Sequence, residues 1–366
     1  MAKIRVGILF GGKSAEHEVS LQSAKNIFDA LDKDKYDCVL IGISKTGRWL
    51  LQEQAEFLLN ASDPRTISLN GKGENVVLAP ESGGSITNIS SKGLAGKIDV
   101  AFPILHGPFG EDGTVQGLLK LAGIPFVGAG ILGSAVGMDK DAAKRLLRDA
   151  GINVCKFLTV RAAEKHKLSF SGITNTLGLP FFIKPANMGS SVGVSKVHNE
   201  AEYETAINRA FEYDNKIIIE EFVPCREIEC SVLDTADRGT IASIAGEITS
   251  THEFYSYDAK YLDENGAVLE IPAKLPEELM IEVKRLAIDS FKALCCEGLA
   301  RVDFFLHKSN GKLFVNEINT MPGFTRISMY PKLWEASGIN YRDLIDMLIA
   351  NAFDRFANEN KLKTSY

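Results

Sequence analysis

The sequence predicts two fold classes within one chain: an α/β segment first, then α+β segments in which antiparallel sheets dominate. The first third alternates short apolar runs with helical patterns, which is typical of a parallel sheet with helices on its faces. After Asp139, several strand-like runs follow one another before the next helix, which indicates α+β structure. A chain of 366 residues is also too long for a single core and is expected to form two or three domains.

The elements of the first third are expected in a regular order. The stretch between residues 50 and 96 is rich in Gly, Ser and Asn and has weak periodicity, so it receives no assignment. On either side of it, strands are expected over "KIRVGILF", "YDCVLIGIS", "KIDVAFPIL" and "IPFVG", and helices over "SLQSAKNIFDAL" and "TVQGLLKLAG".

The remaining elements begin with the helix "DKDAAKRLLRDAG", for which Gly151 is a good C-terminal residue. Further helices are expected near residues 200–213, over 276–296 and over "YRDLIDMLIANAFDRF". Strands are expected over "VCKFLTV", "FFIKPA", "KIIIEEFV", "REIECSVLD", "TIASIAGEIT" and "VLEIPA", and the hairpin "ARVDFFLHKSNGKLFVNEIN" follows the helix of 276–296.

Composition and charge exclude several classes of protein. The net charge of −6 and a pI near 5.7 show no excess of positive charge, so nucleic acid is not expected as the main partner. No apolar stretch reaches membrane-spanning length, and the first residues do not form a signal peptide, so a cytoplasmic location is expected. The six cysteines contain no C-x-x-C pair and are expected to be reduced and buried, and the six histidines are too scattered for a zinc site.

Two glycine patterns resemble nucleotide-binding motifs but do not fit their structural context. "GILFGGKS", residues 7–14, matches the P-loop pattern, yet its variable positions are mostly the first strand itself rather than a loop after it. "GAGILG", residues 128–133, matches the dinucleotide pattern, but Asp149 has the required spacing only within a helix. The second pattern is better explained by glycines that let a loop pass close to a domain junction.

The hairpin near the C-terminus carries the sharper chemical signal. Glu317 and Asn319 are two residues apart on one strand and therefore share a face. A two-residue turn would place Asp303 on the other face, whereas a three-residue turn over 309–311, or a bulge between Asp303 and Glu317, would pair Asp303 with Glu317 and Arg301 with Asn319. In the second case, two carboxylates, an amide and an arginine would suit Mg²⁺ that holds a triphosphate. The alternative is a solvated sheet edge.

Phosphate groups also need cations and backbone donors. "IKPANMGSSVGV" supplies Lys184 at a strand end and then a loop of small residues whose N–H groups can close over phosphate. Lys140, in "GMDKD", is the second candidate cation.

Seven motifs together resemble one family. In order they are "EHEVSLQS", "HGPFGEDGTVQG", "GMDK", "IKPANMGSSVGVSKV", "YDAKY", "RVDFF" and "NEINTMPGFT". This series is similar to that of the D-alanine:D-alanine ligases, ATP-grasp enzymes of peptidoglycan synthesis. The resemblance covers nearly the whole chain except residues 50–96. It implies a three-domain ATP-grasp architecture, with a Rossmann-like substrate-binding domain over 1–128 and two α+β lobes over 129–215 and 216–366 that enclose ATP.

The resemblance also implies a role for individual residues. Glu16, Ser190, Tyr261 and Arg301 would be catalytic: Glu16 would pair with the first substrate's ammonium, Tyr261 would close a lid through Ser190, and Arg301 would stabilise an oxyanion. The implied ATP-binding residues are Lys140, Lys184, Ser191, Glu220, Glu221, Phe222, Val223 and Glu227. The implied metal ligands are Asp303, Glu317 and Asn319, and the implied substrate-binding residues are Glu16, His106, Gly323, Ser328 and Met329.

The chemistry implied by the family is activation of a carboxylate. ATP would phosphorylate the first D-alanine, the amine of the second would attack the acyl phosphate, and D-alanyl-D-alanine, ADP and phosphate would result. Two Mg²⁺ ions, replaceable by Mn²⁺, and a homodimer are expected. The alternatives are a ligase that uses D-lactate or D-serine as the second substrate, or another ATP-grasp carboxylate–amine ligase. Those D-lactate and D-serine ligases alter the lid at the position of Tyr261, which favours the dipeptide product.

Overall fold

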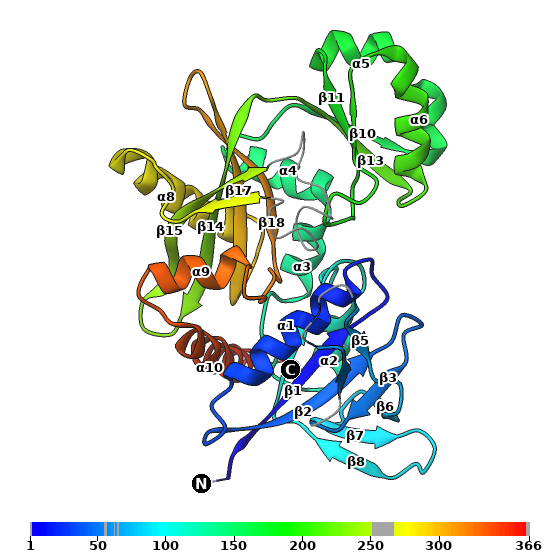
Figure 1. Cartoon of the computed structure of the whole chain (residues 1–366), viewed down its shortest axis with the longest axis vertical. Helices are drawn as coiled ribbons and strands as arrows, with labels where there is room; N and C mark the ends of the chain where they lie inside the picture. Colours follow the sequence, from blue (N-terminus) through cyan, green and yellow to red (C-terminus); the bar gives the residue numbers. More distant parts are fainter. Residues whose placement is uncertain (1, 55–56, 62, 64–65, 251–266, 364–366) are drawn as a thin grey trace.

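The computed structural model describes residues 2–54, 57–61, 63, 66–250 and 267–363. Three main sheets form three bodies (Figure 1). The first contains the blue and cyan strands near the N-terminus, the second is the small green body at the upper right, and the third includes the orange hairpin.

The N-terminal sheet has seven strands in the order β8-β7-β6-β3-β2-β1-β9. Only β9, β1 and β2 are mutually parallel, so the predicted parallel sheet is correct for these three strands. The others are antiparallel and arise from the stretch around 50–96 that had no assignment. The strands are β1 (Ile4–Gly11), β2 (Tyr36–Ile43), β3 (Trp49–Gln52), β6 (Glu74–Leu78), β7 (Ser85–Asn88), β8 (Leu94–Lys97) and β9 (Val100–Ile104), with β4 (Leu58–Leu59) and β5 (Ser68–Leu69) paired separately.

Both faces of this sheet are buried at β1, which is apolar at successive positions. Ile8 and Phe10 join a core that includes α1 (His17–Ala30), whereas Leu9 joins a core that includes α2 (Thr114–Leu121). The strand itself therefore contributes the apolar residues of the P-loop-like pattern, and Ile8, Leu9 and Phe10 are each 0% exposed. The prediction that this pattern is not a phosphate loop is confirmed for its variable positions.

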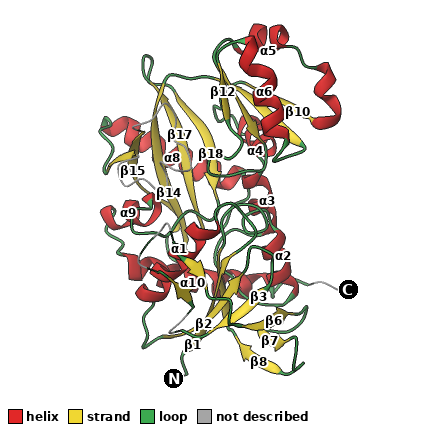
Figure 2. Ribbon diagram, turned by 45° about the vertical axis from the view of Figure 1, so that its right-hand side comes forward, coloured by secondary structure: helices red, strands yellow, loops and turns green. Residues whose placement is uncertain are grey.

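The central sheet is antiparallel, in the order β10-β13-β11-β12. Two helices pack beside it (Figure 2), and its apolar core draws only on residues 158–219. Phe181 and Ile183 join this core. Because successive side chains of a strand point to opposite faces, Lys184 lies on the other face of the sheet. The elements are β10 (Phe157–Arg161), β11 (Phe181–Pro185), β12 (Ser195–Val197), β13 (Lys216–Glu221), α5 (Phe170–Leu177), α6 (Glu200–Phe211) and a 3₁₀ turn over Ala162–Lys167.

The third sheet is also antiparallel, in the order β16-β15-β14-β17-β18. One face is apolar and packs on α8 and on Ala143 and Leu147 of α4. Helix α4 ends as predicted, with Gly151 at a φ of 76°. The elements are β14 (Cys225–Thr235), β15 (Gly239–Ser250), β16 (Ala267–Glu270), β17 (Leu299–His307), β18 (Leu313–Asn319), α3 (Ile131–Met138), α4 (Lys140–Asp149) and α8 (Glu277–Ala293).

The β17–β18 hairpin reaches the predicted pairing by a different route. Asp303 is opposite Glu317 and Arg301 is opposite Asn319, as the three-residue turn required. The turn is not the three-residue one, because His307 bonds to Lys312 and leaves four residues in the loop, and the alternative of a bulge is confirmed. A register shift between Asp303 and Phe304 supplies the extra residue that restores the pairing.

The end of the chain returns to the N-terminal sheet. Helices α9 (Met329–Ala336) and α10 (Tyr341–Glu359) follow the hairpin, and α10 lies beside α1 (Figure 1). Phe324, Trp334 and Leu348 belong to the same apolar core as Phe10 and Phe102 of the N-terminal sheet. The N-terminal and C-terminal regions therefore share one core, while the central sheet has its own. The division at residues 128/129 and 215/216 stays a prediction.

The second glycine pattern lies at a domain junction, as expected. A Cβ on Gly128 would approach the Met321 side chain to 2.7 Å, and one on Gly133 would approach the Cys295 carbonyl oxygen to 2.5 Å. Gly130 precedes α3, whose N-terminus faces Glu297 rather than an open nucleotide site. These glycines allow close packing between the N-terminal and C-terminal regions.

Candidate active site

The polar face of the third sheet collects the predicted metal ligands. Arg301 donates two hydrogen bonds to Asp303, each 2.7 Å long, and its Nε lies 2.9 Å from Glu229. Asn319 Nδ2 donates to the same Asp303 carboxylate at 3.0 Å. Cross-strand pairing therefore brings the four predicted residues Arg301, Asp303, Glu317 and Asn319 onto one face, and the solvated-edge alternative does not fit their partly buried positions.

The ligand set is suited to Mg²⁺. Asp303 and Glu317 supply carboxylate oxygens and Asn319 supplies an amide oxygen, and hard oxygen ligands are those that Mg²⁺ prefers. Over the part of the chain that the structure describes, no three His, Cys, Asp or Glu side chains form a metal cluster. Two carboxylates and one amide would leave coordination positions for water and phosphate oxygens, which is usual for Mg²⁺ beside a nucleotide.

Lys140 lies between the polar face of the third sheet and the glycine-rich loop, which is residues 186–194 between β11 and β12. Its Nζ is 3.4 Å from Glu317 Oε2 and donates to the carbonyl oxygen of Met188 at 2.7 Å. Its backbone N–H also bonds to the Ala186 carbonyl oxygen at 3.0 Å. The start of α4 therefore places a cation next to both the metal face and the loop that carries Ser190.

Lys184 is part of a buried triad of charges. The Glu220 carboxylate contacts Lys184 with one oxygen and Lys144 with the other. Lys144 and Glu220 are each 1% exposed. Burial by itself would raise the pKa of Glu220, but the charges of the two lysines lower it to about 2, so the carboxylate stays ionised. In this structure Glu220 orients Lys184, and its predicted contact with the adenine amino group remains a prediction.

Replacement of Lys144 is expected to destabilise the protein, because it leaves a buried carboxylate with one cation instead of two. We expect Lys144→Met to lower the free energy of unfolding by about 3 kcal/mol, since Glu220 keeps Lys184. The matched control is Arg145→Met on the exposed side of the same helix, where a surface ion pair with Asp141 is worth less than about 1 kcal/mol. Urea unfolding followed by circular dichroism measures both, and equal stabilities of the two variants would contradict the prediction.

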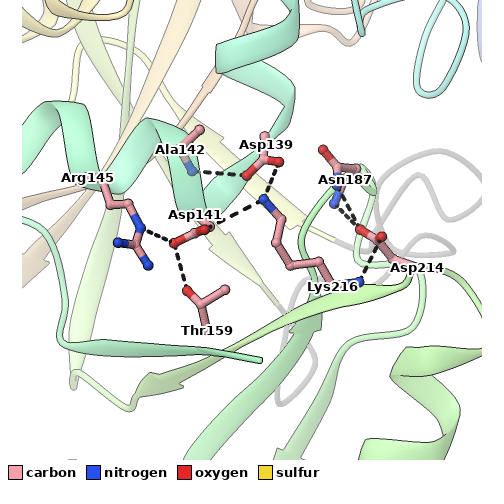
Figure 3. A network of polar contacts seen from close by, with 8 residues as sticks. All are labelled: Asp139, Asp141, Ala142, Arg145, Thr159, Asn187, Asp214 and Lys216. Carbon is pink, nitrogen blue, oxygen red and sulfur yellow. Dashed lines mark hydrogen bonds and ion pairs between the residues drawn. The ribbon is translucent and has the colours of Figure 1, made fainter. Parts of the chain in front are cut away.

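A second network joins α4 to the central sheet (Figure 3). Lys216, at the start of β13, contacts the carboxylates of Asp139 and Asp141. Asp141 also accepts a 2.7 Å hydrogen bond from Thr159 on β10. Asp214 accepts bonds from Asn187 at 2.8 and 2.9 Å. The network therefore fixes both the helix that begins at Lys140 and Asn187, near the start of the glycine-rich loop.

The predicted nucleoside-binding residues follow β13. Glu221 Oε1 accepts a 2.7 Å hydrogen bond from the Lys156 backbone. Phe222 is 39% exposed, lies 6.2 Å from the Phe182 ring and has Lys196 Nζ 4.6 Å from its own ring centroid. Val223 is buried, and Glu227 lies on β14. The exposed aromatic edge beside Lys184 is a suitable surface for a base, and the individual contacts stay predictions.

Glu16 connects the N-terminal region to the glycine-rich loop. It is 7% exposed, directly precedes α1 and accepts a hydrogen bond from Ser190 Oγ. Ser190 and Ser191 both have left-handed φ angles, of 49° and 59°, which turns the loop toward Glu16. The predicted contact between Ser190 and Glu16 is confirmed, whereas Tyr261 lies outside the described residues.

The predicted substrate-binding residues of the C-terminal region surround the loop after β18. Ser328 precedes α9 and Met329 is its first residue, so the helix N-terminus faces this loop. A Cβ on Gly323 would lie 2.7 Å from Ser328 Oγ, which explains the glycine. His106 is 5% exposed, and burial lowers its pKa while the charge of Glu16 opposes this shift.

Three site residues were missed by the sequence analysis: Lys144, Lys216 and Glu111. Lys144 is four residues after Lys140 and therefore on the same side of the helix, a spacing that the sequence did show. Glu111 lies within "HGPFGEDGTVQG" and accepts hydrogen bonds from two backbone N–H groups. Burial and the charge of Glu16 raise the pKa of Glu111, and the two N–H groups oppose this shift. Lys216 had no sequence signal.

The chain is similar to known proteins over nearly its full length. The family models described as D-ala D-ala ligase N-terminus and D-ala D-ala ligase C-terminus match residues 5–129 and 146–350. The chain is 54% identical to a D-alanine–D-alanine ligase of Oceanobacillus iheyensis over 99% of each chain.

Two solved structures are similar over nearly the full length. A D-alanine-D-alanine ligase of Coxiella burnetii has a TM-score of 0.85 at 36% identity and covers 99% of this chain and 97% of its own. A D-Ala:D-Ser ligase of Enterococcus faecalis has a TM-score of 0.83 at 36% identity and covers 96% of this chain and 100% of its own.

Proposed function

This chain belongs to the D-alanine–D-alanine ligase family, and on that premise we propose that it joins two D-alanines to D-alanyl-D-alanine with ATP. The full-length identity of 54% to a named ligase supports the reaction. The observation that carries the proposal is the cross-strand pair of Asp303 and Glu317, with Arg301 on one side and Lys140 on the other. A nucleotide-binding protein without turnover would not need this arginine next to Asp303.

Each step of the reaction has a group in the described residues. Lys140 and Lys184 would bind the phosphates of ATP, and Glu16 would bind the ammonium of the first D-alanine by a charge-assisted contact. The carboxylate of that substrate takes the γ-phosphoryl group, which turns a poor electrophile into a good one. Mg²⁺ held by Asp303, Glu317 and Asn319 would neutralise the charge on the phosphates during this transfer.

The second step forms the peptide bond. The amine of the second D-alanine attacks the acyl phosphate to form a tetrahedral adduct, and the adduct then expels phosphate to leave the peptide bond. Arg301 and the backbone N–H of Gly323 would stabilise the negative charge on the oxygen, an effect commonly worth a few kcal/mol. The N-terminus of α9, at Ser328 and Met329, would bind the carboxylate of this second substrate.

Phosphate release from ATP tests the proposal directly. We expect release with D-alanine, none above background with L-alanine, and no depsipeptide when D-lactate is added beside D-alanine. ATP consumption that does not depend on D-alanine would disprove the assignment. A product that contains D-serine or D-lactate would instead favour the alternative ligase classes.

Three further properties implied by the family stay predictions. None of the helices in the described residues is long and apolar enough to cross a membrane. A cytoplasmic location and a homodimer are expected from the family, and light scattering at several concentrations measures the second. The number of bound metal ions is measured by equilibrium binding of Mn²⁺ in the presence of an ATP analogue.

A further inference from the structure

The loop after β18 is held by residues from the other end of the chain. The Met321 carbonyl oxygen lies 3.0 Å from His106 Nδ1, and the Met321 N–H donates to Glu111 Oε1 at 3.2 Å. Both partners come from the segment between β9 and α2. One segment of the N-terminal region therefore binds both polar atoms of the Met321 main chain.

Phe324 of the same loop is fixed in a similar way. The Phe324 N–H donates to Ser23 Oγ at 3.2 Å, and the Phe324 carbonyl oxygen accepts from Asn26 at 3.1 Å. Both of these side chains belong to α1. Among the described residues, none accepts a hydrogen bond from the N–H of Gly323, which lies between the two fixed positions. The loop is therefore held on both sides of the group that would face the oxyanion.

Glu111 is placed to connect two regions with its two oxygens. Oε2 accepts from the Gly107 N–H at 2.6 Å within its own segment, and Oε1 accepts from Met321 across the interface. Its sequence neighbour Asp112 is different. Among the described residues, Asp112 accepts only from Phe109 at 2.8 Å and Thr114 at 3.0 Å, both close to it in the sequence.

We propose that Glu111 is a positioning residue for the second chemical step: by holding the Met321 N–H, it fixes the Gly323 N–H where charge develops. This inference rests on the proposed function, since it assigns a role within that reaction. An oxyanion donor is effective when it is oriented before the reaction begins. A loop attached only through Phe324 and His106 would sample more orientations of Gly323 and stabilise the tetrahedral adduct less.

Two substitutions of Glu111 test separately the length of the side chain and its two acceptor oxygens. Glu111→Gln keeps the shape but replaces one acceptor oxygen by an NH₂ group that would face an N–H. Glu111→Asp keeps both acceptor oxygens but is one methylene shorter, so it cannot hold Gly107 and Met321 together. We expect both to lower kcat by about 10- to 100-fold, with the KM for ATP changed less than about 3-fold.

The decisive measurement is inhibition by a phosphinate dipeptide analogue, whose tetrahedral phosphorus stands in for the adduct carbon. The inhibition constant should rise by the same factor by which kcat falls, because the analogue needs the same donor. Asp112→Asn is the matched control and should change neither quantity. Thermal melting of each variant checks the fold.

The inference is overturned if kcat falls while the affinity for the analogue is retained, if Glu111→Asp behaves like the parent, or if Asp112→Asn has the same effect. Each of these results leaves the proposed function intact. A parent protein that releases no phosphate with D-alanine would instead contradict the proposed function itself.

Discussion

Replacement of Glu317 by glutamine is expected to lower turnover by about 100-fold or more and to raise the Mg²⁺ concentration needed for half-maximal activity. The amide keeps the shape of the side chain but removes one of the two carboxylates on the metal face. It also removes the charge opposite Lys140, which lies 3.4 Å away. The affinity for D-alanine should change much less, because Glu16 and the α9 N-terminus lie on other elements.

Initial rates across a range of Mg²⁺ concentrations measure this effect. Glu278→Gln, an exposed carboxylate in the first turn of α8, is the control for loss of one negative charge. Unchanged Mg²⁺ dependence in Glu317→Gln would remove Glu317 from the metal site. A loss of D-alanine binding as large as the loss of turnover would indicate a general disruption instead.

The second large effect is expected at Lys184. Lys184→Met should weaken ATP binding by about 10- to 100-fold, because a partly buried cation that contacts phosphate is worth roughly 1.5 to 3 kcal/mol. Lys13→Met should leave ATP affinity within about 3-fold of the parent. Lys13 is exposed, and its Nζ lies 5.0 Å from the Phe109 ring centroid.

Calorimetric titration with a non-hydrolysable ATP analogue ranks the two variants. Because Lys184 also pairs with the buried Glu220, thermal melting must show that Lys184→Met is folded at the titration temperature. The opposite ranking would restore the P-loop reading of "GILFGGKS".

The hairpin shows how far the sequence could predict the site. Alternation along a strand placed Glu317 and Asn319 on one face, and that prediction is confirmed. The pairing depends on a bulge rather than on the three-residue turn, the two arrangements that the sequence left open. The apolar positions Leu313, Val315 and Ile318 all join one core, and their spacing changes from two to three. That change is the sequence signature of a bulge, because regular alternation would place Ile318 on the other face.

Other parts of the site were beyond prediction from sequence. The strands from residues 50–96 are short, and they form by addition to the edge of an existing sheet rather than by their own periodicity. Lys144 and Lys216 belong to networks whose acidic partners are distant in sequence, so only the packing of α4 against the central sheet brings them together. Glu111 was inside a quoted motif, but its partner Met321 is more than 200 residues away.

The shared core of the N-terminal and C-terminal regions determines which parts of the protein unfold together. Three bodies are visible, yet the apolar contacts of α9 and α10 with β1 and α1 join two of them into one unit. Residues 158–219 form the other unit, which is joined to α4 by ion pairs. We expect two cooperative unfolding transitions rather than three, with the central unit opening on its own. In hydrogen exchange, the amides of β11 and β13 would then exchange together. The amides of β1 and α10 would lose their protection together in a separate transition.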